Sequence, residues 1–262
     1  MALLVTGCYA CGVVALYLTF RSDRSFSLLF SSLSILLPLV MLGIKALLRI
    51  FYTGTWPERA LLAGVLISIA SDLLSWLANA VPLSLVQIGP ALWPVGFGLI
   101  VIGYYAWCFR TDGDAGEYSA RVVTVAVIMG LLALVSSLIA VLAINDIFIH
   151  VGEGLNAFSL QVLWMSWIVF KLMYGLIMLM AAGSRAWHSR TGPDFLQLAS
   201  ISAYFVTDLI QYNIWYFYRT NSPSLHFYFE VSIIKNYFFC LFALGFLASD
   251  SPGPRPRIEA RP

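Results

Sequence analysis

Apolar residues along this chain are gathered into eight long segments, separated by short stretches that are polar or rich in turn-forming residues. A helix needs about 20 mostly apolar residues to cross a lipid bilayer. The segments predict eight membrane-spanning helices, at 3–20, 26–51, 60–80, 91–109, 122–144, 157–183, 195–218 and 225–248. The first segment has no basic stretch before it and no small-residue cleavage site, so we expect a retained helix rather than a cleaved signal.

The composition strengthens this interpretation. Hydrophobic residues make up 60% of the 262 residues and charged residues 11%, whereas soluble domains average about 45–50% and about 25%. These values exclude an ordinary soluble domain and a disordered chain, and the charges are too few for the basic surface of a nucleic-acid-binding protein. We therefore predict an all-α, multi-pass integral membrane protein that is surrounded by membrane lipid and binds no nucleic acid.

Basic residues indicate how the helices are oriented, because cytoplasmic loops are enriched in Lys and Arg. With the N-terminus inside, ten basic residues lie in inner loops or at inner ends, and three lie in outer loops, namely Arg21, Arg24 and Arg219. Arg21 and Arg24 count against this orientation, but the total predicts that both termini face the cytoplasm. Residues 249–262 are rich in proline and charge, which predicts a disordered cytoplasmic tail.

One spacing recurs in the two halves of the sequence. Asp72 lies fifteen residues after Pro57, and Asp208 lies fifteen residues after Pro193, so the two pairs are 136 positions apart. This recurrence predicts two four-helix halves in parallel orientation, at 1–110 and 122–248, related by an axis along the membrane normal. Proline is common at the start of any helix, so coincidence is the alternative.

Four ionisable residues fall at bilayer depth, where a charge is costly and usually functional. Asp72 lies about 18 Å from the inner boundary, at a rise of about 1.5 Å per residue. Asp208 lies at nearly the same depth, and Lys171 and Lys235 lie deep in their helices. Polar residues share a face with each aspartate, which predicts a polar cavity common to both; they are Ser68 and Asn79 on one helix and Tyr204 and Gln211 on the other.

A structural role is the alternative for these charges. Asp208 would then pair with Lys235, and Asp72 with Lys171, only to hold helices together. Metal and cofactor chemistry is not indicated. The three histidines and four cysteines lack the spacing of metal ligands, and no phosphate-binding glycine loop or nucleophile elbow is present. We expect no metal, no cofactor and no disulfide framework.

These features resemble the YhhN/lysoplasmalogenase family of eight-helix membrane hydrolases. The family has a lysine in its second helix, a Gly-Asp-Leu-Leu-like motif in its third and a Ser-Asp-Leu-Leu-like motif in its seventh. The corresponding residues here are Lys45, Ser71-Asp72-Leu73-Leu74 and Thr207-Asp208-Leu209-Ile210. The chain departs from the family in having Ser71 before the first aspartate, Lys45 late in its helix, and no histidine in the fourth helix.

The resemblance implies cleavage of the vinyl-ether bond of a lysoplasmalogen, a lipid-like substrate, with release of a fatty aldehyde. Protonation of a vinyl ether gives an oxocarbenium-like cation that water attacks, so one carboxyl donates the proton while a second stabilises the cation or activates the water. Asp72 and Asp208 are the expected catalytic pair, with neither assigned as the acid. Lys235 or Lys171 would hold the phosphate or set the ionisation of an aspartate. The further substrate-binding candidates are Tyr204, Ser68, Gln211 and Asn79.

Three other functions stay open. Repeated halves and buried acids are also features of proton-coupled carriers, but carriers have broken helices, and only Pro38, Pro90 and Pro94 suggest any here. A non-catalytic membrane subunit or sensor would explain the aromatic content of 15%. A retinal protein built on Lys235 is disfavoured by the eight predicted helices. The distance between the two aspartates discriminates between these functions, because a hydrolase needs both aspartates at one pocket.

Overall fold

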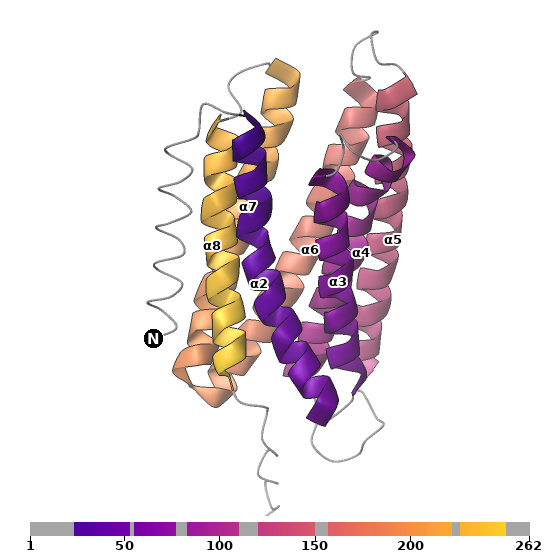
Figure 1. Cartoon of the computed structure of the whole chain (residues 1–262). Coiled ribbons are helices and arrows are strands. Elements are labelled where there is room, and N and C mark those ends of the chain that lie inside the picture. Colours follow the sequence, from indigo (N-terminus) through magenta and orange to yellow (C-terminus); the bar gives the residue numbers. More distant parts are fainter. Residues whose placement is uncertain are drawn as a thin grey trace, which may run out of the picture.

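The computed structural model describes residues 24–52, 55–76, 83–109, 120–149, 157–221 and 226–249, which form helices joined by short connections. The helices are α2 (Arg24–Tyr52), α3 (Trp56–Trp76), α4 (Leu83–Cys108), α5 (Ala120–Ile149), α6 (Ala157–Ser189), α7 (Gly192–Asn221) and α8 (His226–Ala248). They run side by side in one elongated bundle (Figure 1). The prediction of an all-α fold is confirmed for this part of the chain.

Five of the described helices, α2, α4, α5, α6 and α8, are long and apolar enough to cross a membrane. α3 and α7, the helices that carry Asp72 and Asp208, are not among these five. The predicted first segment, 3–20, and the tail after residue 249 lie outside the described residues. The described chain is thus a helical bundle with several helices able to span a membrane.

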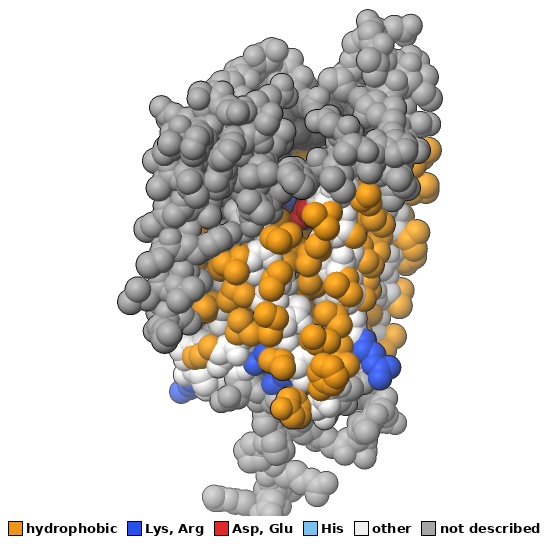
Figure 2. Space-filling view, viewed as in Figure 1, with side chains coloured by type: hydrophobic (Ala, Val, Ile, Leu, Met, Phe, Trp, Pro, Cys, Tyr) orange, Lys and Arg blue, Asp and Glu red, His pale blue; other side chains and the backbone are white. Residues whose placement is uncertain are grey.

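The outer surface of the bundle is strongly apolar. On α5, leucine side chains such as Leu131, Leu134 and Leu138 project outward, and Leu134 is 67% exposed. Hydrophobic side chains cover most of the described surface in view, and Lys and Arg gather at one end of it (Figure 2). A continuous apolar surface of this size is unfavourable in water and is expected on a protein surrounded by lipid.

Helix boundaries differ most from the predicted segments at two places. α4 begins at Leu83 rather than near residue 91, so Pro90 and Pro94 lie inside the helix. Proline is tolerated within membrane helices because neighbouring helices satisfy the freed backbone groups. The polar linker predicted between α6 and α7 is reduced to Arg190 and Thr191. Arg190 has a φ of 54°, the left-handed conformation with which many helices end.

The described helices close into a ring. Each packs against the next helix in sequence, α2 packs against α8, and α4 also contacts α6. Large aromatic side chains fill the centre, and the fully buried ones include Phe97, Tyr104, Tyr174, Tyr204 and Phe239. A polar group placed among such rings depends on other protein groups for its hydrogen bonds, since water and lipid headgroups are excluded.

Glycines let α3 and α4 approach each other closely. A Cβ atom at Gly64 would lie 2.6 Å from the carbonyl oxygen of Gly96, and one at Gly96 would lie 2.8 Å from the backbone nitrogen of Ser68. Neither position has room for a side chain. Close backbone contact through small residues is a usual way for membrane helices to associate, so these glycines hold α3 and α4 as a tight pair.

The first turns of α3 and α7 are built alike. The Thr55 hydroxyl donates a hydrogen bond to the Glu58 carboxylate, and the Thr191 hydroxyl donates one to Asp194 at 2.7 Å. In each helix the carbonyl of that threonine accepts a bond from the backbone nitrogen four residues later, at 3.4 Å and 3.1 Å. Each threonine thus starts its helix with an acidic side chain in the first turn, where negative charge is favourable.

A glycine of the following helix packs against each of these starts. A Cβ atom at Gly103 of α4 would lie 2.7 Å from the Pro57 carbonyl oxygen, and one at Gly245 of α8 would lie 2.9 Å from that of Pro193. The prolines are 136 positions apart and the glycines 142. The α3–α4 and α7–α8 pairs therefore share both a kind of helix start and a close contact between that start and a glycine of the next helix.

Asp194 ties α6 to α7 at this end of the bundle. It accepts hydrogen bonds from Arg185 at 2.6 Å and from Ser189 at 2.5 Å, and the Arg185 guanidinium also lies 3.9 Å from the centroid of the Trp107 ring. Burial acts to raise the pKa of Asp194, but the hydrogen bonds from Ser189, Arg185 and Thr191 outweigh it and hold that pKa below its usual value. The ionised carboxylate therefore stabilises this end.

Acid should weaken the same end. Because the pKa of Asp194 is lower in the folded than in the unfolded chain, its carboxylate stabilises the fold above the unfolded pKa of about 4, and this contribution is lost as the pH falls through the folded pKa. We expect the thermal midpoint, followed by circular dichroism in detergent, to drop below about pH 4. The drop should be smaller in Asp194→Asn, and an equal drop in both proteins would contradict this role.

Candidate functional site

Asp208 lies at the centre of a buried charged cluster, formed with Lys171, Lys235 and Tyr174. Its Oδ2 accepts hydrogen bonds from the Lys171 ammonium at 2.5 Å and from the Tyr174 hydroxyl, and its Oδ1 accepts one from Lys235 at 3.1 Å. Only 1% of the Asp208 side chain is exposed. Since a buried carboxylate must be paired and hydrogen-bonded, these contacts leave both of its oxygens engaged.

Aromatic rings enclose the Lys171 side of the charged cluster. The Lys171 ammonium lies 4.7 Å from the centroid of Trp93 and 5.3 Å from that of Tyr212. Trp167 stacks against both rings, with centroids 5.4 Å and 5.7 Å away. Trp167 and Lys171 are four residues apart, which places them on one face of α6. Cation–π contacts thus supplement the ion pair with Asp208.

Asp72 has different surroundings from Asp208. It is half-buried on α3, and its Oδ2 is buried with no hydrogen-bond partner among the described residues. Lys235 is near enough to act on Asp72 electrostatically, and Asp72 acts in the same way on Tyr204. The two aspartates therefore share Lys235 as a neighbour, but only Asp208 contacts it directly.

One predicted ion pair is present and the other is replaced. Asp208 contacts Lys235, as the structural alternative predicts. Lys171, however, pairs with Asp208 rather than with Asp72. The reason is the arrangement of the described helices, because α6 packs against α7 and has no contact with α3.

The remaining predicted binding residues are partly brought together. Ser68 is buried on α3, and its hydroxyl has no hydrogen-bond partner among the described residues. The buried hydroxyl of Tyr204 lies beside that of Tyr174 but makes no hydrogen bond of normal geometry. Gln211 is buried on α7. Asn79 lies outside the described residues.

Lys45, the lysine singled out by the family resemblance, lies elsewhere. Its ammonium donates to the carbonyl oxygens of Leu247 and Ser249, both at 2.9 Å. These carbonyls end α8, where a cation is favourable. Leu247 is twelve residues beyond Lys235, about 18 Å along the helix. Lys45 therefore joins α2 to the end of α8 and is not part of the charged cluster.

Several neighbours of the cluster were not predicted, and Asn236 and Trp93 are two examples. Asn236, next to Lys235, donates to the Ser34 hydroxyl at 2.6 Å and so links α8 to α2. A polar residue directly after a lysine in an apolar segment is a signal that could have identified Asn236. Trp93, which contacts Lys171, carries no such signal, because nothing in the pattern distinguishes it from the many other aromatic residues.

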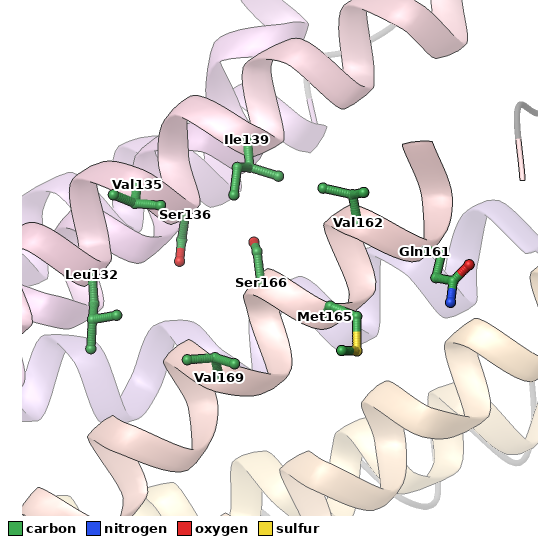
Figure 3. Close-up of a pocket in the computed structure, with 9 residues that line it drawn as sticks. All are labelled: Leu132, Val135, Ser136, Ile139, Gln161, Val162, Met165, Ser166 and Val169. Carbon is green, nitrogen blue, oxygen red and sulfur yellow. The ribbon is translucent and has the colours of Figure 1, made fainter. Parts of the chain in front are cut away.

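A separate pocket of about 510 Å³ faces outward between α5 and α6. Figure 3 shows its lining side chains on two facing helices. The lining is apolar apart from Ser136, Gln161 and Ser166. Neither Asp72 nor Asp208 lines this pocket, so it is not the shared cavity that the sequence predicts around the two aspartates.

Metal ligands are not gathered in the described part of the chain. No group of three or more histidine, cysteine, aspartate or glutamate side chains there could hold a metal ion. Cys108 and Cys240 are buried free thiols. The Asp208 carboxylate is already occupied by two ammonium groups.

Comparisons with known proteins assign no family to this chain. No protein-family model, no curated protein and no solved structure matches it. The case for a function therefore depends on the geometry of the site.

Proposed function

We propose that this chain is a multi-pass membrane hydrolase that cleaves the vinyl-ether bond of a lysolipid, as a lysoplasmalogenase does. One observation carries the proposal: two carboxyls share Lys235 as a neighbour but have unlike surroundings. Asp208 is engaged on both oxygens, whereas Asp72 keeps a buried oxygen with no partner among the described residues. Unlike surroundings are the usual basis for different roles of two carboxyls in acid–base catalysis. Asp72 is then the group that exchanges a proton with the substrate.

Asp72 acts first as an acid and then as a base. Its proton passes to the vinyl carbon that is not bonded to oxygen, which leaves a positive charge shared by the ether oxygen and the adjacent carbon. Water attacks that carbon, and the Asp72 carboxylate accepts a proton from the water, giving a hemiacetal. The hemiacetal C–O bond then breaks, and its hydroxyl proton moves to the departing glycerol oxygen. The products are a fatty aldehyde and the alcohol of the head group.

Asp208 is a positioning residue in this scheme. It holds the ammonium groups of Lys171 and Lys235 in place. When Asp72 loses its proton, the new carboxylate lies within reach of both Lys235 and the substrate cation, and both interactions are strong in an interior of low dielectric constant. The charge that forms during the reaction is therefore balanced by groups that are already fixed.

We further propose eight spans in two related halves, with both termini in the cytoplasm. The segment 3–20 supplies the eighth span. The halves are supported by the equal spacing from proline to aspartate, by the threonine starts of α3 and α7, and by the matching contacts of Gly103 and Gly245. The excess of Lys and Arg in the loops assigned to the inner side supports the orientation.

A proton-coupled carrier is the second candidate, and one observation favours it. The charged cluster comes from α6, α7 and α8, while Asp72 comes from α3. The site thus lies where the two proposed halves meet, which is where carriers with internal repeats bind their substrates. Asp72 would then load and release a proton during transport instead of passing it to a vinyl ether.

Asp72→Asn should abolish hydrolysis, because it removes the exchangeable proton and keeps the size of the side chain. Purified wild-type protein supplied with lysoplasmalogen should release fatty aldehyde, measured by mass spectrometry. Asp72→Asn should release it about 100-fold more slowly, or slower still, as expected for the loss of a general acid. Ser166→Ala is the matched control, because it removes a buried hydroxyl that has no hydrogen-bond partner among the described residues but lies outside the charged cluster.

Folded wild-type protein that releases no aldehyde would reject the hydrolase. The carrier would then be tested in proteoliposomes, by proton uptake driven by a gradient of candidate solute. Loss of that uptake in Asp72→Asn, with Ser166→Ala unchanged, would support the second candidate.

A further inference from the structure

We propose that Lys235, Tyr204, Ser68 and Asp72 form a binding subsite for the singly charged oxyanion head of an amphiphile, and that Asp72 takes up one proton when this head group binds. The ligand chemistry is a carboxylate or a phosphodiester attached to an apolar chain. The inference concerns binding alone. It holds whether the site hydrolyses its ligand or transports it.

Lys235 has hydrogen-bond donors that its described neighbours do not use. An ammonium group has three donors, and Lys235 makes one hydrogen bond to a described residue, Asp208. Its other close contact is with the ring of Tyr204, 5.8 Å from the centroid. Lys171, by contrast, is surrounded by Asp208 and two aromatic rings. Lys235 is also the more accessible lysine, with 11% of its side chain exposed against 5%.

Two buried hydroxyl groups add to these donors: Tyr204 lies beside Lys235, and Ser68 lies one helical turn from Asp72 and against Gly96 of α4. Tyr204 and Ser68 are both more than nine-tenths buried, and neither hydroxyl has a hydrogen bond of normal geometry to a described residue. Buried polar groups are nearly always satisfied by protein, water or a ligand. With the donors of Lys235, these hydroxyls favour a ligand head that is rich in acceptors, which describes an oxyanion.

The four groups come from three helices and are related to one another in pairs. Lys235 on α8 acts electrostatically on Asp72 of α3, and Asp72 acts on Tyr204 of α7. Ser68 lies one helical turn before Asp72 on the same face of α3. Because Asp72 is only half-buried, the region is not sealed on its side.

Charge balance accounts for the proton. In the empty subsite, the ammonium groups of Lys171 and Lys235 balance the carboxylates of Asp208 and Asp72. An oxyanion bound to Lys235 adds a third negative charge, and repulsion between like charges at one site favours protonation of one of them. Protonated Asp72 restores the balance and donates a hydrogen bond to the ligand. A neutral head group would add no negative charge, so its binding would not cause Asp72 to take up a proton.

Asp72, which lies outside the charged cluster, is the carboxyl that is free to change its charge. The described titratable groups that interact electrostatically with Asp72 are Lys235 from α8 and Tyr204 from α7. Asp208, Lys171 and Tyr174 lie on the other side of Lys235, in the charged cluster. α2 and α4 pack along α3. Their described residues that contact the neighbours of Asp208 and Lys235 are Trp93, which contacts Lys171, and Ser34, which contacts Asn236, and neither titrates. Asp208 keeps both oxygens on the lysines, so the added proton goes to Asp72.

Calorimetric titration of the purified full chain in detergent micelles tests this inference. The probes are decanoate and methyl decyl phosphate, which carry one negative charge on different oxyacids, and decanol, which is neutral. Titrations in two buffers of different ionisation enthalpy give the number of protons taken up. We expect one proton per bound anion with the wild type and none with Asp72→Asn. Lys235→Gln should weaken binding by about 10- to 100-fold, as expected for a charge-assisted hydrogen bond.

The serines provide a matched comparison. Ser68→Ala should weaken anion binding by about 2- to 10-fold, as expected for one neutral hydrogen bond, and Ser166→Ala should leave it unchanged. The proposal is wrong if decanol binds as tightly as the anions, if neither anion binds, or if the wild type takes up no proton. Equal losses in the two serine variants would also overturn it. Binding of only one anion with a proton would identify the oxyacid, and Asp72→Asn keeps the test decisive if Lys235→Gln does not fold.

Discussion

Asp208→Asn should destabilise the protein by about 3–5 kcal/mol, the range seen when one partner of a buried ion pair is removed. The variant leaves the ammonium groups of Lys171 and Lys235 buried near each other with no carboxylate between them. Thermal unfolding in detergent, followed by circular dichroism, should show a midpoint lower by about 10 °C. No other single substitution in the cluster leaves two buried charges without an ion-pair partner.

A second variant separates charge from side-chain shape. In Asp208→Asn/Lys171→Met only one ammonium group remains unpaired, so this protein should be more stable than Asp208→Asn alone by about 1 kcal/mol or more. If Asp208→Asn alone unfolds within about 1 kcal/mol of the wild type, then Asp208 is not what holds the two lysines in place. Its role as a positioning residue would be rejected with it.

Gly96→Ala should force α3 and α4 apart. The added methyl group would lie 2.6 Å from the Ser68 hydroxyl oxygen and 2.8 Å from the Ser68 backbone nitrogen. A backbone atom cannot move aside as a flexible side chain can, so the expected cost is about 3 kcal/mol, the upper part of the range for overpacking. The free energy of unfolding in a mixed-micelle denaturation series measures it.

Gly130→Ala is the control for this substitution. Gly130 lies within α5, and a Cβ atom there would meet nothing within 4 Å. Alanine is the better helix former by about 1 kcal/mol, so this variant should match or exceed the wild type in stability. Equal destabilisation by Gly96→Ala and Gly130→Ala would show that α3 and α4 do not meet as closely as described.

The helices could be predicted from the sequence because long apolar runs need no tertiary information. The residues at which the helices begin and end could not be predicted as well, and Pro90 shows why. A proline between apolar runs indicates a break in a helix, yet Pro90 lies within α4. A proline can stay inside a membrane helix because neighbouring helices satisfy the backbone groups that it leaves without a hydrogen bond. The start of α7 was predicted more closely, since Pro193 and Asp194 are favourable in the first turn of a helix.

The sequence predicted most residues of the candidate site, but not which lysine pairs with which aspartate. Lys171 lies 37 residues before Asp208, whereas Ile35 lies 37 residues before Asp72. The sequence therefore already contained the reason why only Asp208 has a lysine at this position of the preceding helix. Which helix Lys171 faces depends on the order of helices around the ring, and the periodicity of a single helix does not encode that order.

A similar comparison explains the other lysine. Lys235 lies ten residues before Gly245, and Trp93 lies ten residues before Gly103. Once the two glycines are matched by their contacts, Trp93 takes the position in α4 that Lys235 takes in α8. The equivalence becomes visible only through the glycine contacts, because the two helices differ at most other positions.

The tight packing of α3 on α4 and of α7 on α8 has a consequence for biogenesis. Asp72 and Asp208 lie within α3 and α7, and a charge at bilayer depth makes it less favourable for either helix to leave the translocon for the bilayer on its own. Each packs most extensively against the helix that follows it in the chain, and both of those helices are apolar enough to span. Membrane insertion should therefore proceed in helical hairpins, and each aspartate enters the bilayer only when the ribosome has delivered the next helix.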